Sequence, residues 1–294
     1  MGFRPRSRKY KTLKMIIFKK AADLNDYLRN ERKKDIKTGF VPTMGALHAG
    51  HISLIQASRA ASDLTICSIF VNPRQFNDPK DFEKYPVTIE KDILLLEKQR
   101  ADILFLPAVG EIYPPGEILE NYDTGQLGTV LEGRYRPGHF QGVCQVMSRL
   151  LTRIKPDHLF MGQKDFQQCL VVKQLISRMN IPVEFHMAPT SREADGLALS
   201  SRNSRLSAAQ RKNAVAISRA LRYIRDHFAA GDPSEALAKA QHLLDAAGFT
   251  TDYIAIARVT DLQPGKEWDG REKIIALIAA FQGEVRLIDN LLLN

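Results

Sequence analysis

Near its beginning the chain reads Thr38-Gly39-Phe40-Val41-Pro42-Thr43-Met44-Gly45-Ala46-Leu47-His48-Ala49-Gly50-His51. The apolar pair Phe40 and Val41 predicts a buried strand, and Gly45 allows the backbone a positive φ or a close approach to a ligand. From His48 onward a broad apolar face predicts a helix. The chain is therefore expected to pass from a strand through a glycine turn into a helix.

The two histidines of this turn lie three residues apart at the expected helix start, so His48 and His51 share one face. Free N–H groups and the positive end of the helix dipole are expected at the same place, and both favour a phosphate. The alternative is that one histidine caps the helix and the other belongs to the core. A phosphate site is the preferred interpretation of the turn.

Short apolar runs alternate with helical patterns up to about residue 190. This alternation predicts an α/β fold, a Rossmann-like doubly wound parallel sheet with helices on both faces. We expect strands at residues 40–41, 64–71, 102–107, 159–162 and 183–187, and helices at 23–34, 48–62, 88–100, 141–154 and 166–179. The Gly/Pro/Tyr-rich residues 110–140 are expected to form an irregular active-site loop region.

Beyond about residue 191 the pattern changes to two helices followed by three strands. The helices are expected at 207–229 and 234–247, and the strands at 253–259, 273–280 and 285–288. We therefore predict a nucleotide-binding catalytic domain at 15–190 and a smaller C-terminal α+β lid domain at 191–294, with a hinge near 189–192.

The net charge of +9 over 294 residues is concentrated at one end. Residues 1–14 hold six basic residues and no acid, so they contribute +6 and leave +3 for the rest. We interpret residues 1–14 as a basic extension, expected to be disordered, before a natural start at Met15. This distribution argues against a nucleic-acid partner, and deleting residues 1–14 tests that alternative.

The length of the apolar runs and the spacing of the cysteines indicate the cellular compartment. No apolar run approaches the ~20 residues that span a bilayer, so no membrane partner is expected. Cys67, Cys144 and Cys169 are scattered and show no CxxC spacing. We predict reduced, buried thiols in a cytoplasmic protein.

Polar groups follow two of the expected strands. Asn72 and Gln75 follow the strand at 64–71, where amides can bind hydroxyls or a carboxylate, although an ordinary polar loop has the same composition. The segment Gly162-Gln163-Lys164-Asp165-Phe166-Gln167-Gln168 ends a strand with glycine and supplies a lysine for phosphate. Asp165 and Gln168 also match a helix-capping box.

Two basic loops complete the candidate site. Residues 192–203 place two serines and Arg202 after Gly196, so this loop can close over a triphosphate or act as a solvated linker. Residues 133–140 carry Arg136 and either line the site or make a turn. Glu132 and Asp92 are acidic candidates for helping to hold magnesium, but neither has a recognisable ligand spacing.

Together these motifs resemble the pantothenate synthetase family, the AMP-forming pantoate–β-alanine ligases. The resemblance is carried by residues 42–51, 69–76, 136–140, 162–168, 196–203 and 286–290. It runs from Met15 to the C-terminus in the family's order and spacing. The HxGH motif alone is shared by many nucleotidyltransferases and class I aminoacyl-tRNA synthetases, so a nucleotidyltransferase that stops at an adenylylated product is the alternative.

The resemblance implies an ATP-dependent condensation of (R)-pantoate with β-alanine through a pantoyl adenylate, releasing AMP and pyrophosphate. It also implies ATP as co-substrate, Mg²⁺, and a cytoplasmic homodimer. His51 matches the family's proton donor, and the other catalytic residues implied are His48, Lys164 and Arg202. ATP is expected to bind the glycine turn and two later loops: Met44, Gly45, Ala46, Leu47, His48, Ala49, Gly50, His51, Gly162, Gln163, Lys164, Asp165, Ser191, Leu199, Ser200, Ser201 and Arg202.

The acid substrates are implied to bind amides. Gln75 and Gln168 match the pantoate-binding positions, and Gln75 also lies where β-alanine is expected. Asn72 and Arg136 match other pocket positions, and no metal ligand is assigned. Three departures are visible: Val87 replaces a usual arginine, Leu199 a common methionine and Ser191 a usual valine.

Overall fold

The computed structural model describes residues 14–294, so the predicted basic extension lies outside the described residues except for Lys14. By internal contacts the chain divides into two compact units. The first unit contains the residues up to Asp123 together with 141–162 and 172–188, and the second contains 124–140, 163–171 and 189–294. The predicted domain bounds of 15–190 and 191–294 stay predictions.

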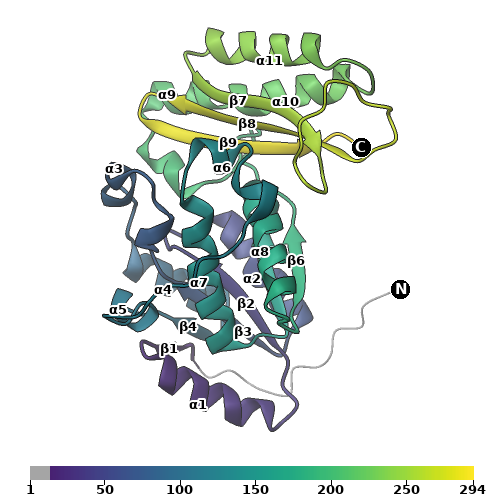
Figure 1. The fold of residues 1–294 in the computed structure, drawn as a ribbon. Helices are drawn as coiled ribbons and strands as arrows, with labels where there is room; N and C mark the ends of the chain where they lie inside the picture. Colours follow the sequence, from purple (N-terminus) through teal and green to yellow (C-terminus); the bar gives the residue numbers. More distant parts are fainter. Residues whose placement is uncertain (1–13) are drawn as a thin grey trace. The chain divides into compact units, whose positions relative to one another are not determined.

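The first unit is built on a parallel sheet of six strands in the order β1-β4-β3-β2-β5-β6 (Figure 1). Its strands are β1 (Ile16–Phe18), β2 (Thr38–Thr43), β3 (Leu64–Ile69), β4 (Ile103–Phe105), β5 (His158–Gly162) and β6 (Glu184–Ala188). Every neighbouring pair runs parallel. This confirms the predicted doubly wound α/β sheet and adds β1 as an edge strand.

Helices cover both faces of this sheet. They are α1 (Ala21–Arg32), α2 (Ala49–Ala61), α3 (Pro79–Glu83), α4 (Ile89–Lys98), α5 (Val109–Ile112), α7 (His139–Ile154) and α8 (Phe166–Arg178), with a 3₁₀ turn η1 (Pro73–Gln75). Val41, Cys67 and Leu104 pack against α2 and α4 in one core cluster. The alternate strand residues face the other way, and Figure 1 shows α7 in front of the sheet and α2 behind it.

The second unit holds an antiparallel sheet of β7 (Thr250–Arg258), β8 (Ile274–Gln282) and β9 (Val285–Leu292). Its helices are α6 (Glu132–Tyr135), α9 (Ala208–Ala214), α10 (Ala216–His227) and α11 (Ser234–Ala246), with 3₁₀ turns η2 (Gly125–Gly128), η3 (Gln163–Asp165) and η4 (Ser201–Arg205). Figure 1 shows α10 and α11 on one side of the sheet, where Leu221 and Leu244 pack against Ile256 and Ile278. This confirms the predicted α+β composition.

Two expectations differ in detail from the structure. The helix predicted at 207–229 is divided at Val215, which keeps helical dihedrals (φ −61°, ψ −20°) between α9 and α10. The loop region 110–140 contains the short helices α5 and α6. Each is only four residues long, too short for a periodic apolar pattern to reveal it.

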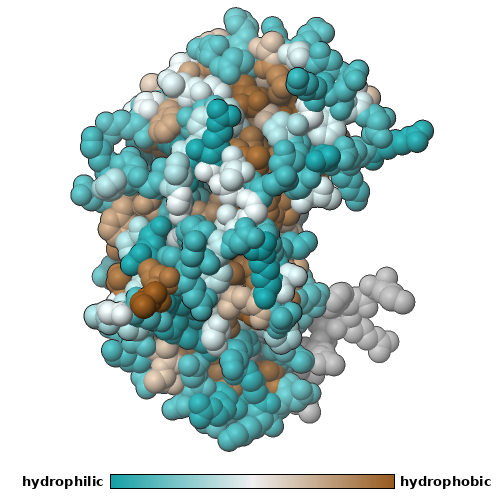
Figure 2. All heavy atoms as spheres, in the orientation of Figure 1, coloured by the Kyte–Doolittle hydropathy of each residue, from teal (hydrophilic) through white to brown (hydrophobic). Residues whose placement is uncertain are grey.

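Among residues 14–294 no helix combines the length and the apolar character that crossing requires. Figure 2 shows mostly hydrophilic residues on the face that it draws, with hydrophobic residues in separate groups.

Candidate active site

The first unit has a topological switch point between β2 and β5. From β2 the strand order proceeds to β3 and β4 on one side and to β5 and β6 on the other. Within the described chain only two residue pairs, Gly39–His158 and Phe40–Leu159, join β2 to β5. The two strands are therefore not paired with each other near their carboxyl ends, at Thr43 and Gly162. Ligands of open α/β sheets bind at such a point.

The glycine turn after β2 is held by a buried aspartate. The Ala46 and Leu47 N–H groups donate to the two carboxylate oxygens of Asp92 at 2.9 and 2.8 Å. Gly45 has φ +82°, and a Cβ there would lie 3.0 Å from Ile69 Cγ2, so both the backbone and the space favour glycine. Asp92 is 2% exposed, so its role here is to shape the turn rather than to hold magnesium.

The two histidines of the turn form a reciprocal helix cap. His48 is the N-cap of α2 and its Nδ1 accepts from the Gly50 N–H at 3.2 Å. His51 Nδ1 accepts from the His48 N–H at 3.2 Å. Because Nδ1 accepts in each ring, the hydrogen of each neutral imidazole is on Nε2. The Nε2–H groups of His48 and His51 are therefore the hydrogen-bond donors that this turn orients, because the Gly50 N–H already donates to His48.

Gln75 lies beside the glycine turn, and Asn72 holds the Gln75 side chain in place. Gln75 Nε2 donates to Met44 Sδ (2.8 Å), and Asn72 Nδ2 donates to Gln75 Oε1 at 3.1 Å. Asn72 is 1% exposed; it also donates to the Gly142 carbonyl and accepts from Tyr113 and from the Arg74 N–H. Its amide is fully used by protein groups, so Asn72 fixes Gln75 rather than offering a free amide.

The second unit contains a polar pocket, lined by groups of both charges, on the sheet face away from α10 and α11. Its polar lining residues are Glu132, Arg136, His139, Lys164, Asp165, Gln167, Gln168, Tyr253, Asp289 and Asn290. The predicted residues Arg136, Lys164, Asp165 and Gln168 thus line one cavity. Lys164 lies 3.8 Å from Asp165, and its side chain is 17% exposed.

A buried carboxylate anchors this pocket. Arg286 pairs with Glu132 through two bonds of 2.7 and 2.8 Å, and the Tyr253 hydroxyl donates to Glu132 at 2.9 Å. Burial alone would raise the pKa of Glu132, but the Arg286 guanidinium, Arg136 and Tyr253 lower it to about 2. Glu132 is therefore a structural anion and is occupied by protein partners, which argues against a magnesium role.

We predict that Glu132→Gln destabilises the protein by about 3 kcal/mol at neutral pH, since it removes the anion that pairs with a buried arginine. The folded pKa lies below the ordinary value of 4.5, so this contribution is complete above pH 4.5 and is lost as the pH falls toward 2. Denaturant unfolding of both proteins from pH 7 to pH 2 measures the difference. Glu267→Gln, at an exposed position of the same unit, is the control. An equal deficit at all pH values would contradict the electrostatic account.

Asn290 on β9 clamps the loop that carries Lys164. Its Nδ2 donates to the Gln163 and Lys164 carbonyls, both at 2.9 Å, and its Oδ1 accepts from Gln163 Nε2 at 3.2 Å. The neighbouring Asp289 pairs with Arg192 at 2.6 and 2.9 Å. Burial raises the pKa of Asp289, and Arg192 opposes that rise. The end of β9 therefore fixes both η3 and the start of the loop at residues 192–203.

The predicted lid residues lie on a tightly bonded loop. The Leu199 N–H donates to the Ser191 carbonyl at 3.0 Å, and Ser200 caps η4 by accepting from the Arg202 N–H at 3.3 Å. Burial lowers the pKa of Arg136, the Glu132 carboxylate opposes that fall, and the positive charges of Arg202 and Arg286 add to it.

Sequence reasoning missed the residues that hold these groups in place. Gln167 is buried and bonds the Leu127 and Val130 carbonyls and the Glu132 N–H, so it positions Glu132. Asp92, Arg286 and Asn290 likewise hold other groups in place: the glycine turn, Glu132 and the Lys164 loop, respectively. The sequence pointed to Arg286 and Asn290 only as members of segment 286–290, which resembles the family. That resemblance did not indicate which residues they bond.

The parallel sheet with a histidine-capped turn at its switch point defines the class as nucleotide-binding α/β proteins. The model of the family described as Pantoate-beta-alanine ligase matches residues 16–292. A pantothenate synthetase of Bacteroides thetaiotaomicron is 43% identical over 270 residues, covering 92% of this chain and 95% of that one. One of Cereibacter sphaeroides is 44% identical over 277 residues, covering 94% and 98%.

Solved structures agree. The crystal structure of pantothenate synthetase from Thermus thermophilus has a TM-score of 0.87 and 39% identity, covering 94% of this chain and 99% of that one. The pantoate-beta-alanine ligase from Francisella tularensis, complexed with beta-gamma ATP and beta-alanine, has a TM-score of 0.80 and 37% identity, covering 95% and 97%. The chain belongs to the pantoate-beta-alanine ligase family.

Proposed function

We propose that this protein is an AMP-forming ligase that joins (R)-pantoate to β-alanine to make pantothenate. The observation that carries the proposal is the family match over residues 16–292. The histidine-capped turn at the switch point supports it, because the reaction needs donors held close to phosphate oxygens.

The chemistry follows in two steps. A pantoate carboxylate oxygen attacks the α-phosphorus of ATP, and the bond from that phosphorus to the bridging oxygen of the β-phosphate breaks to release pyrophosphate. The neutral β-alanine amine then attacks the acyl carbon of the adenylate, AMP leaves with the carboxylate oxygen, and the nitrogen loses a proton. No protein nucleophile takes part, so positioning and charge stabilisation carry the rate.

Within this scheme the turn histidines act on the phosphates. His48 and His51 carry their hydrogens on Nε2, so each can donate to a phosphate oxygen as negative charge develops. Lys164 and Arg202 supply positive charge to the phosphates. Lys164 is held through its own carbonyl by Asn290, so its backbone is placed independently of any ligand.

Side-chain amides are assigned to bind the two acid substrates, pantoate and β-alanine. We assign Gln75 and Gln168 to pantoate and Gln75 also to β-alanine, with Arg136 as a further cationic group. The contact with Asn72 supports the assignment of Gln75, because it fixes one end of the amide. An amide held in this way loses little side-chain entropy when a substrate binds.

Magnesium, subunit number and compartment complete the proposal. Mg²⁺ would be held by triphosphate oxygens and water, as is usual for this ion, because Asp92 and Glu132 are occupied by protein groups. Bound there, it would neutralise phosphate charge. A homodimer follows from the family resemblance, and light scattering measures it. A cytoplasmic location fits the three buried cysteines, which are free thiols.

The test is the dependence of turnover on each substrate. Protein, Mg-ATP and pantoate are incubated with and without β-alanine, and AMP, pyrophosphate and pantothenate are quantified. Sustained turnover is expected only with β-alanine, with one pantothenate per AMP. Pyrophosphate release that ignores β-alanine and proceeds with another acid would instead favour a nucleotidyltransferase that stops at an adenylylated product.

Val87→Arg is expected to leave the ligase rate unchanged within about twofold or to raise it slightly. Val87 is 67% exposed, so the longer side chain displaces no core group and the free energy of unfolding should change by less than about 0.5 kcal/mol. Steady-state kinetics for pantoate and a thermal melt measure both. A tenfold loss of kcat/KM would show that the valine is itself required.

A further inference from the structure

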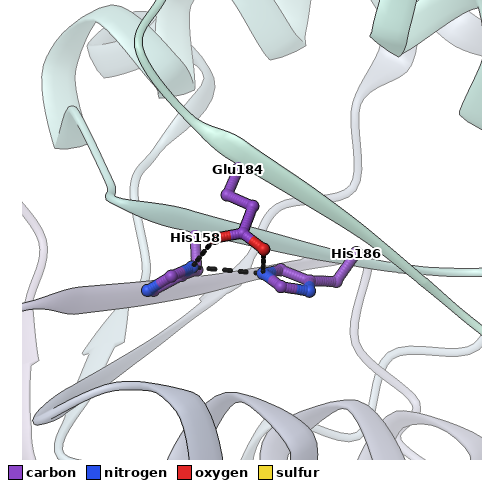
Figure 3. Close-up of side chains that lie close together, drawn as sticks. All are labelled: His158, Glu184 and His186. Atoms are coloured by element: carbon purple, nitrogen blue, oxygen red, sulfur yellow. Dashed lines mark hydrogen bonds and ion pairs between the residues drawn. The ribbon is translucent and has the colours of Figure 1, made fainter. Parts of the chain in front are cut away.

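Two histidines and a glutamate meet at the amino ends of β5 and β6, away from the switch point (Figure 3). In the parallel register His158 pairs with Glu184, and Phe160 pairs with His186. Residues two apart on a strand share a face, so His158, Glu184 and His186 lie on one side of the sheet. His158 and Gly162 are the two ends of β5, about 13 Å apart along the strand.

The donor atoms have the spacing of metal ligands. His158 Nδ1 lies 3.1 Å from His186 Nε2 and 3.3 Å from Glu184 Oε2, and His186 Nε2 lies 3.6 Å from Glu184 Oε1. Ligands placed tetrahedrally at zinc bond lengths are about 3.4 Å from each other. The three observed separations bracket that value, so the donor groups are spaced as the ligands of one ion would be.

The chemistry of the set also favours a transition ion. Two imidazoles and one carboxylate suit Zn²⁺ and its neighbours rather than Mg²⁺ or Ca²⁺, which prefer oxygen. The His186 ring stacks on Phe160, with ring centres 4.5 Å apart and 9° between planes, which restrains its orientation. Glu184 is 66% exposed, so a fourth position is open to water.

We propose that His158, Glu184 and His186 form a binding site for a divalent transition-metal ion of the zinc class, distinct from the ligase chemistry. The ion would link β5 to the edge strand β6, as a clip between two strands. The competing account is a hydrogen-bonded trio with no affinity for metal. The trio belongs neither to the histidine-capped glycine turn nor to the polar pocket of the second unit, so its test is independent of the proposed ligase activity.

Zinc binding by the full-length protein tests the proposal. The protein is treated with chelator, dialysed, titrated with Zn²⁺ by calorimetry and then analysed for bound metal. One equivalent is expected in the wild type, and none at the same site in His186→Gln and Glu184→Ala. His242→Gln, an exposed histidine on α11, is the matched control and should keep the equivalent.

The histidine pair of the glycine turn must be distinguished from the trio. His51→Asn leaves the trio intact and should also keep the equivalent. No binding by the wild type, binding retained in both trio variants, or binding lost in His51→Asn would each overturn the proposal.

Two measurements keep the test decisive if a trio variant folds poorly. Zn²⁺ should raise the wild-type Tm by about 2–4 °C at tenfold excess over Kd, because the ion binds the folded state. Co²⁺ added to the wild type should give the visible absorption of a tetrahedral nitrogen–oxygen site and lose it to added Zn²⁺. A wild type without either response contains only the hydrogen-bonded trio.

Discussion

Replacing His51 with alanine is expected to slow adenylate formation by about 10²–10³-fold while ATP affinity changes far less. The reason is that the Nε2–H of His51 is oriented before substrate binds, since its Nδ1 is occupied by the His48 N–H. A preorganised donor acts mostly where charge develops in the transition state. Single-turnover formation of pantoyl adenylate, measured by rapid quench with pantoate and ATP, gives the rate directly.

A second variant separates catalysis from helix capping. In His51→Asn the amide oxygen can still accept from the His48 N–H, but the donor at the Nε2 position is lost. We expect His51→Asn to melt close to the wild type and to be nearly as slow as the alanine variant. A wild-type adenylation rate in His51→Asn would mean that His51 serves only as a cap.

Lys164→Ala is expected to reduce adenylate formation by a similar factor of about 10²–10³, because a positive charge near the phosphates is lost. The loop itself should not move, since Asn290 holds it through the carbonyls of Gln163 and Lys164 rather than through the lysine side chain. The same rapid-quench assay measures the loss, and a thermal melt checks that the fold is kept.

Lys173→Ala supplies the matched control for that charge. Lys173 is an exposed lysine on α8, the helix that follows the Lys164 loop, so the substitution removes the same charge and the same number of atoms. It should change adenylation by less than twofold. Equal losses in the two variants would indicate a general effect of net charge, and a near-normal rate in Lys164→Ala would remove Lys164 from the chemistry.

The parts of the fold that depend on local pattern could be predicted from the sequence. The passage from β2 through the glycine turn into α2 was expected to begin its helix near His48, and α2 begins at Ala49 with His48 as its cap. Strand–helix alternation predicted the parallel sheet, because buried parallel strands are continuous apolar runs. The short elements α5 and α6 and the edge strand β1 contain too few residues for such a pattern.

The parts of the site that could not be predicted depend on contacts between residues that are far apart in the sequence. Glu132 and Asp92 were candidates for magnesium because an unpaired carboxylate and a paired one look alike in sequence. The partner of Glu132 is Arg286, 154 positions away, and the partners of Asp92 are backbone N–H groups of the glycine turn. The trio of His158, Glu184 and His186 likewise depends on the register of two strands joined by α8.

The most direct test of the ligase account follows one oxygen atom. Pantoate labelled with ¹⁸O in its carboxylate is converted with unlabelled ATP and β-alanine, and the AMP, pyrophosphate and pantothenate are analysed by mass spectrometry. We predict one ¹⁸O in each AMP, one ¹⁸O kept in the new amide carbonyl, and none in pyrophosphate. Unlabelled AMP, or label in pyrophosphate or phosphate, would contradict attack of pantoate on the α-phosphate.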